Sequence, residues 1–141
     1  MYGFSDVQFS NFNVWVDNNP GNITAAKVQY AYRFYKTGGA TTTLSPLSKM
    51  LALYKTDITG YKQKENTGKS VGISIKVDST LALPKIQIFR INYIENGQPP
   101  VINIICEQNV SDLIDPTSTI QYIDDGSNIE EYDVSEFLSI I

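Results

Sequence analysis

Residues 27–37 read Lys-Val-Gln-Tyr-Ala-Tyr-Arg-Phe-Tyr-Lys-Thr, and large apolar side chains recur along them with a period of two. A β-strand places alternate side chains on opposite faces, whereas a helix would distribute the same residues around its circumference. One face of this strand carries Val28, Tyr30, Tyr32 and Phe34. The phase of these side chains favours a face turned toward a core over an exposed aromatic platform for sugar rings.

The same period recurs along the chain, and turn signals separate the segments that carry it. Gly38-Gly39 supplies the positive φ of a tight turn, and Asn96-Gly97 is a strong hairpin signal. Further strands are predicted over residues 41–44, 50–54, 70–77, 85–93, 101–107 and 120–123. This succession of short strands predicts an all-β fold, an antiparallel immunoglobulin-like or fibronectin-type-III-like β-sandwich, with an up-and-down barrel as the alternative.

The length of 141 residues fits one domain with a short appendage. We predict an N-terminal strand or linker over residues 1–19, the β-sandwich over residues 20–110, and an acidic extension over residues 111–141 that leads to the next domain. Asp133 and Glu136 have the spacing of a helix-capping box, which predicts a short helix over residues 134–141. Because the last residues are apolar, we expect the chain to be a piece of a longer protein or to dock onto a neighbour.

Histidine is absent, and Cys106 is the single cysteine. These counts exclude catalysis by an imidazole, a zinc site of the Cys/His type and an internal disulfide. Cys106 lies in an apolar run and is expected to be a small buried hydrophobe. No catalytic residue and no cofactor is predicted, and no apolar run has the length of about 20 residues that a membrane-spanning helix needs.

The net charge of −4 conceals a strong segregation along the chain. Residues 27–90 hold all eleven Lys and Arg against three acids, and residues 91–141 hold ten acids and no base. The two regions either neutralise each other within one fold or form opposite patches that meet head to tail between copies. The candidate interaction residues are Asp124, Asp125, Glu130, Glu131, Asp133 and Glu136 on the acidic side and Lys55, Lys62, Lys64 and Lys69 on the basic side.

Three other kinds of site fit parts of the sequence less well. Gly68-Lys69-Ser70 matches the end of a phosphate-binding loop, but Gln63 stands where that motif needs a glycine, and a strand pattern follows. The acidic cluster could bind a hard cation such as calcium, although the EF-hand spacing is absent. Paired carboxylates could hydrolyse a glycoside, but nothing in the sequence fixes the separation that this chemistry needs.

Three segments resemble one family of phage tail proteins. Residues 28–35, Gly38-Gly39 and residues 42–48 (Thr-Thr-Leu-Ser-Pro-Leu-Ser) resemble the tail stabilisation (nozzle or muzzle) proteins of crAss-like and related short-tailed phages. In that family a strand of the form YQYAYRLY leads through a glycine turn into an SPLS segment. Residues 85–90 and 120–137 are similar to later parts of the same family, and the resemblance covers about residues 20–141.

The resemblance implies a fibronectin-type-III-like module within a much larger virion protein of the portal-to-tail conduit. It implies a location in the virion tail after synthesis in the bacterial host cytoplasm, with neighbouring tail and portal-ring subunits as partners and a homo-oligomeric ring as the assembly. No membrane and no specific nucleic-acid binding are expected. The family offers no catalytic residues, so the expected role is structural. A module that binds a host glycan or surface protein is the alternative.

Overall fold

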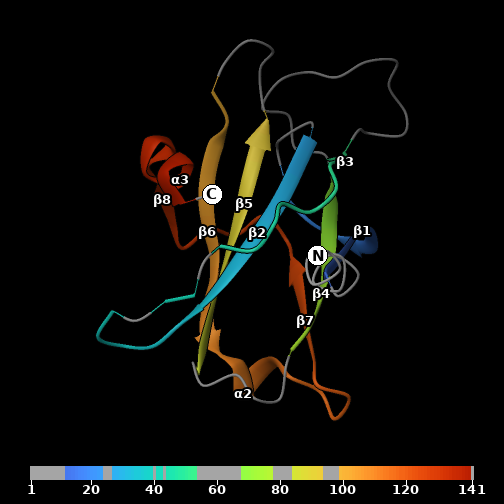
Figure 1. The fold of residues 1–141 in the computed structure, drawn as a ribbon. Helices are drawn as coiled ribbons and strands as arrows, with labels where there is room; N and C mark the ends of the chain where they lie inside the picture. Colours follow the sequence, from blue (N-terminus) through green and yellow to red (C-terminus); the bar gives the residue numbers. More distant parts are fainter. Residues whose placement is uncertain are drawn as a thin grey trace, which may run out of the picture.

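The computed structural model describes residues 12–23, 27–39, 41–42, 44–53, 68–77, 84–93 and 99–140. Strands dominate these ranges, and two short helices accompany them (Figure 1). In chain order the elements are β1 (Phe12–Pro20), β2 (Lys27–Tyr35), β3 (Leu51–Ala52), β4 (Lys69–Lys76), β5 (Lys85–Tyr93), β6 (Val101–Asn109), α2 (Val110–Leu113), β7 (Thr119–Asp124), β8 (Glu130–Tyr132) and α3 (Val134–Ile140). The predicted Asn96-Gly97 turn lies outside the described residues.

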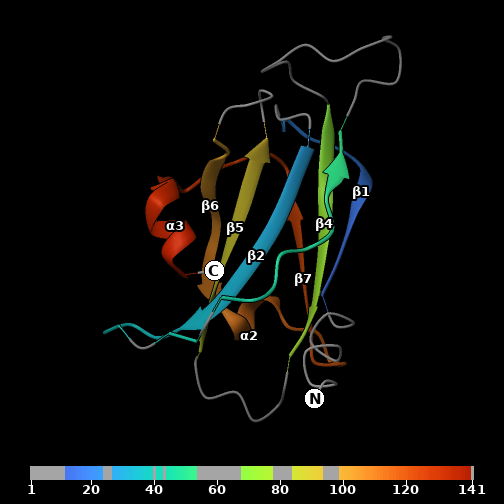
Figure 2. The ribbon, with the colours of Figure 1, turned by 45° about the horizontal axis from the view of Figure 1, so that its top comes forward.

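The strands form two antiparallel sheets. A three-stranded sheet has the order β1-β4-β7, and a five-stranded sheet has the order β3-β2-β5-β6-β8. Figures 1 and 2 show β2, β5 and β6 side by side in one layer and β1, β4 and β7 in the other. The prediction of an all-β antiparallel sandwich with a short C-terminal helix is therefore confirmed.

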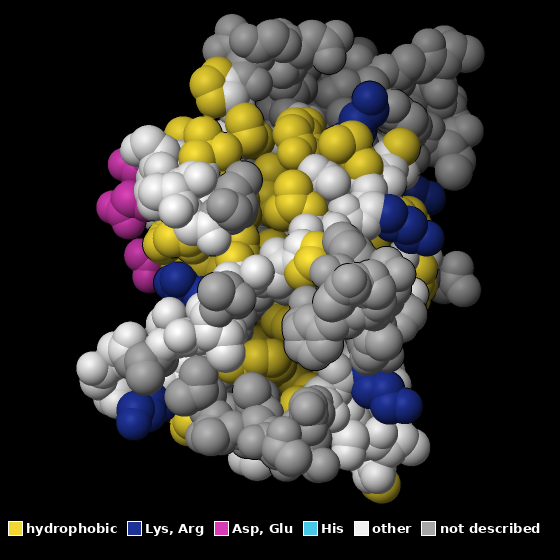
Figure 3. Space-filling model, in the orientation of Figure 1, with side chains coloured by type: hydrophobic (Ala, Val, Ile, Leu, Met, Phe, Trp, Pro, Cys, Tyr) yellow, Lys and Arg dark blue, Asp and Glu magenta, His cyan; other side chains and the backbone are white. Residues whose placement is uncertain are grey.

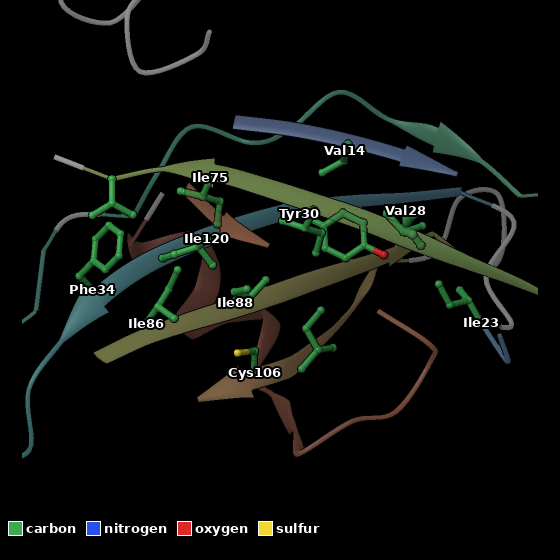
Figure 4. Close-up of a cluster of buried hydrophobic side chains, with 14 of the residues drawn as sticks. Val14, Ile23, Val28, Tyr30, Phe34, Ile75, Ile86, Ile88, Cys106 and Ile120 are labelled. Atoms are coloured by element: carbon green, nitrogen blue, oxygen red, sulfur yellow. The ribbon is translucent and has the colours of Figure 1, made fainter. Parts of the chain in front are cut away.

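The main core lies between the sheets and is built from the predicted alternate side chains. On β2, Val28 and Tyr30 are fully buried and Phe34 is 9% exposed, so the aromatic face of this strand points into the core. Figure 4 shows these side chains converging with those of β4, β5, β6 and β7. Burial of an aliphatic side chain of this size stabilises the fold by about 1.5–3 kcal/mol. The other buried members are Val14, Ile23, Leu53, Val71, Ile73, Ile75, Val77, Ile86, Ile88, Ile105, Cys106 and Ile120.

A second, smaller core covers the opposite face of the five-stranded sheet. Phe89 on β5 is fully buried there, and its ring packs edge-on against Phe137 of α3 with 5.4 Å between centroids. Leu44 and Leu47 pack against the same cluster. Because β6 contributes to both cores, its apolar run is covered on both faces, as its sequence predicted.

The segment after the Gly38-Gly39 turn returns along β2, but not as the strand predicted over residues 41–44. Thr41 forms one isolated bridge with Tyr35. Beyond it, every third residue donates its backbone N–H to a carbonyl of β2, and its hydroxyl accepts the backbone N–H of that same β2 residue. The three pairs of this hydroxyl ladder are Thr42–Phe34, Ser45–Tyr32 and Ser48–Tyr30, with all six N···O distances between 2.8 and 3.0 Å. The paired residues are three apart in residues 42–48 but two apart in β2, so the two segments cannot form a regular backbone ladder. The side-chain hydroxyls therefore accept the β2 N–H groups in place of backbone carbonyls.

Segments on both sides of residues 20–110 enter the sheets. β1 and β7 pair with the two edges of β4, and β8 pairs with β6. The boundaries at residues 19 and 110 stay a prediction. Because strands outside these boundaries pair with strands inside them, we propose that residues 12–140 fold as one unit. A truncation at Asn109 would remove β7 and expose one edge of β4.

One close approach shapes the outer face of the three-stranded sheet. Gly72 on β4 is paired with Trp15 on β1 and with Ile123 on β7. A Cβ atom at Gly72 would lie 2.2 Å from the Trp15 ring, so the indole lies directly on the glycine backbone. Trp15 is 38% exposed and Ile123 is 43% exposed, which leaves a small apolar surface on this face.

Candidate functional site

Asp124, the first of the predicted acidic residues, lies at the end of β7 and is buried between the sheets. It is 2% exposed. Its Oδ2 accepts a hydrogen bond from the Tyr30 hydroxyl at 2.6 Å, and its Oδ1 accepts from Arg90 Nη1 at 2.8 Å. The backbone N–H of Gly126 also donates to Oδ1, at 3.0 Å. Asp124 is therefore a residue of the interior and is not available to a partner at the surface.

Arg90 on β5 is the cation of this buried pair. Its Nε donates to Asn92 Oδ1 at 2.8 Å, and its Nη2 donates to Asn103 Oδ1 at 3.5 Å and to Asn128 Oδ1. A buried guanidinium needs its donors occupied, because each unsatisfied group loses its hydration without compensation. The network thus satisfies the charge while connecting the five-stranded sheet to β7 and to the loop that follows it.

The Tyr30 hydroxyl acts as a permanent donor in this network. Burial raises its pKa well above the ordinary value, and the negative charge of Asp124 and the hydrogen bond to it raise the pKa further, against a smaller opposing effect of Arg90. The phenol therefore stays protonated and keeps its hydrogen bond to Asp124. We name this set of Tyr30, Arg90, Asn92, Asn103 and Asp124 the buried polar network.

The remaining acidic candidates are exposed, and two of them stabilise local turns. Asp125 accepts the backbone N–H of Ser127 at 3.0 Å, and this bond lowers the pKa of its carboxyl. Asp133 accepts from the hydroxyl and the N–H of Ser135, at 2.7 and 2.8 Å, at the start of α3, and these bonds lower its pKa. Asp133 thus caps the helix, as its spacing predicted.

Glu130 and Glu131 on β8 and Glu136 on α3 are exposed without such local bonds among the described residues. Figure 3 shows acidic side chains gathered at one side of the molecule, over β8 and α3. We name Glu130, Glu131, Asp133 and Glu136 the acidic edge. Two exposed apolar residues flank these acids in the chain: Ile129, which is 52% exposed, precedes Glu130, and Leu138, which is 61% exposed, follows Glu136 by two residues.

Of the four predicted basic residues, only Lys69 lies among the residues that the structure describes. Lys55, Lys62 and Lys64 lie outside the described residues. Lys69 opens β4 and is half-buried, and the strand that follows it, rather than a helix, removes the context of a phosphate-binding loop. Lys27 and Lys49, which the sequence did not single out, are both exposed beside β3.

Among the described residues, no group of three or more Cys, Asp or Glu side chains is placed to hold a metal ion. Cys106 is buried, and burial raises the pKa of its thiol to about 12, so it is not a reactive thiolate. Within the same ranges no helix is long and apolar enough to cross a membrane.

The sequence did not identify the buried polar network, although its pattern held a signal. Ile86, Ile88, Arg90 and Asn92 alternate on one face of β5, so a charged residue continues an apolar stripe. A charge in such a position requires a buried counter-charge. Among ten acids in the last third of the chain, nothing in the sequence identified Asp124 as that partner.

One comparison with known proteins gives a match. A family model described as the Crassvirus muzzle protein matches residues 6–141, which is almost the whole chain. No curated protein matches the sequence.

Proposed function

The chain belongs to the Crassvirus muzzle protein family, and from this premise we propose that it is a non-enzymatic structural module of the phage virion that acts in assembly and subunit packing. The observation that carries the proposal is the family match over residues 6–141. The resemblance of residues 28–48 and 85–90 to tail stabilisation proteins agrees with it.

The use of the polar side chains supports a structural role. In the interior, the charged pair Arg90–Asp124 is surrounded by hydrogen-bond partners from β2, β5 and β6. A catalytic carboxylate needs access to a substrate, whereas both charged side chains here are at most 4% exposed. The network fits a module that must keep its shape between neighbouring subunits.

The proposed partners are neighbouring tail and portal-ring subunits, and the proposed assembly is a homo-oligomeric ring in the virion tail, from protein made in the host cytoplasm. An overall negative charge supports the absence of specific nucleic-acid binding, because DNA phosphates are repelled by it. A net negative charge suits a conduit through which DNA must pass, because the protein does not retain the DNA.

Mass spectrometry of purified particles tests the proposal. Peptides of this chain should be present in stoichiometric amounts with the other tail subunits and should survive washing at high salt together with them. Immunogold labelling should place the chain at the tail. Particles that lack these peptides altogether would refute a structural role in the virion.

A glycan-binding module is the second candidate, and Trp15 is the observation that favours it. Its indole lies against Gly72, Trp15 is 38% exposed, and Ile123, which is paired with Gly72 from the other side, is also exposed. An exposed aromatic face of this kind can stack on a sugar ring. A glycan array probed with the chain and with a Trp15→Ala variant separates the two candidates, because only a binding module gives saturable signals that the variant loses.

A further inference from the structure

We propose that the two edges of the five-stranded sheet are complementary contact surfaces through which copies of this chain associate head to tail. The inference rests on the proposed structural function and names the partner and the surfaces that this function would use. The order β3-β2-β5-β6-β8 places β3 and β8 at opposite edges of one sheet. The acidic edge lies at β8 and α3, and exposed lysines lie at β3.

The basic surface is defined by Lys27, Lys49 and Met50, and we name it the basic edge. Lys27 is paired with Ala52 of β3, and Lys49 and Met50 immediately precede that strand. All three side chains are exposed, and Met50 is 44% exposed. The basic edge thus combines positive charge with an exposed apolar side chain, as the acidic edge combines negative charge with Ile129 and Leu138.

Within the described ranges, the exposed charges of the two edges take part in no ion pair. Among the described residues, no ion pair joins Glu130, Glu131 or Glu136 to a base or joins Lys27 or Lys49 to an acid. The ion pair that does form there, Arg90–Asp124, is buried in the core and leaves the edges unchanged. This arrangement favours opposite patches over neutralisation within one fold.

Distance also keeps the two edges apart electrostatically. Four strand-to-strand spacings separate β3 from β8, which amounts to about 19 Å at about 4.8 Å each. The Debye length at physiological ionic strength is about 8 Å, so each edge is largely screened from the other within one molecule. In Figure 3 acidic side chains lie at one side of the molecule with one basic side chain directly below them, and the other basic side chains in view lie at the opposite side and at the lower end.

The register places both edges at the same level of the sheet. Leu51 of β3 pairs with Val28, Val28 pairs with Asn92, and Asn92 pairs with Val101. The next residue of β6, Ile102, pairs with Tyr132 of β8. A second copy displaced sideways along these rows would bring its basic edge against the acidic edge of the first. Since the two surfaces differ, the contact is heterologous and repeats from copy to copy.

Charge reversal in the whole chain tests this contact. We would measure the weight-average mass by sedimentation velocity for the wild type, for Glu130→Lys with Glu131→Lys, for Lys27→Glu with Lys49→Glu, and for the variant with all four changes. The control is Lys36→Glu with Lys76→Glu, which changes the net charge equally at exposed lysines outside the basic edge. Far-UV circular dichroism checks that each variant is folded.

The wild type should exceed its monomer mass of 15.8 kDa at about 0.1 M salt and approach it at about 1 M, where the Debye length falls to about 3 Å. Each reversal of one edge should weaken self-association at least about tenfold, since like charges then face each other. An equimolar mixture of the two reversed variants, and the variant with all four changes, should associate again.

A wild type that stays monomeric at every salt concentration would overturn the inference, as would reversals no stronger than the control. Either result leaves the proposed virion role untouched, because that role is tested by the presence of the chain in purified particles. Conversely, absence from particles with intact head-to-tail association would refute the role and keep the contact.

Discussion

Replacing Asp124 with alanine is expected to cost more stability than replacing any exposed acid of the chain. The Asp124 carboxylate accepts hydrogen bonds from Tyr30, Arg90 and Gly126, and its side chain is 1% exposed. Removing it leaves the Arg90 charge buried without its counter-charge, which costs about 3–5 kcal/mol. That is a large part of the roughly 5–15 kcal/mol by which a domain of this kind is stable.

Urea unfolding at 25 °C measures this cost. With a slope of about 2 kcal/mol per molar urea, a loss of about 4 kcal/mol moves the midpoint down by about 2 M. Asp125→Ala is the matched control, because it changes the neighbouring exposed acid and removes the hydrogen bond from the Ser127 N–H, which should cost about 0.5–1.5 kcal/mol. Trp15 fluorescence and far-UV circular dichroism should report the same midpoint.

A double replacement separates the ion pair from simple packing. Arg90→Met combined with Asp124→Leu removes both charges, so the combined loss should be smaller than that of Asp124→Ala with Arg90 retained. The reasoning is refuted if Asp124→Ala is no more destabilising than Asp125→Ala. It is also refuted if the stability losses of Arg90→Met and Asp124→Leu, each measured alone, add up to the loss of the double variant. Either result would mean that the pair does not connect the sheets energetically.

Three further predictions concern other parts of the fold. Ser45→Ala leaves one β2 N–H without its hydroxyl acceptor and should cost about 1–3 kcal/mol in urea unfolding, against no loss if the ladder is incidental. Gly72→Ala places a methyl group where the Trp15 ring lies, so the fluorescence of Trp15 should change and stability should fall by about 1–3 kcal/mol; an unchanged spectrum would contradict the close approach. Burial raises the pKa of Cys106 from 9.0 to about 12, so the folded state keeps a proton that the unfolded state releases in this range. Stability should therefore fall as pH rises from 9 toward 12, by at most about 1.4 kcal/mol per pH unit from this group, and Cys106→Ala should reduce that slope.

Much of the fold was predictable because its strands alternate clearly. The strand over residues 85–93 has the predicted bounds, and that over residues 27–37 ends two residues earlier, at Tyr35. Both depend on local side-chain periodicity, which the sequence displays directly. The capping of α3 by Asp133 was predictable for the same reason, since a cap is a contact over three residues.

The parts that were not predictable depend on contacts between distant residues. The hydroxyl ladder pairs Ser48 with Tyr30, and a spacing of three residues against two has no periodic signal. Tyr30 and Asp124 are 94 residues apart, so the sequence could place Asp124 only in an acidic cluster and not in the core. The charge segregation was visible in the sequence, but its location at opposite edges required the strand order.

The hydroxyl ladder has a consequence for behaviour at high protein concentration. An unprotected sheet edge can recruit strands from other molecules and start aggregation. On the outer side of β2, the N–H and carbonyl groups of Tyr30, Tyr32 and Phe34 are all occupied by the ladder. Pro46 within the ladder segment has no N–H with which to recruit a further strand. The ladder therefore blocks the addition of a strand from another molecule to this part of β2.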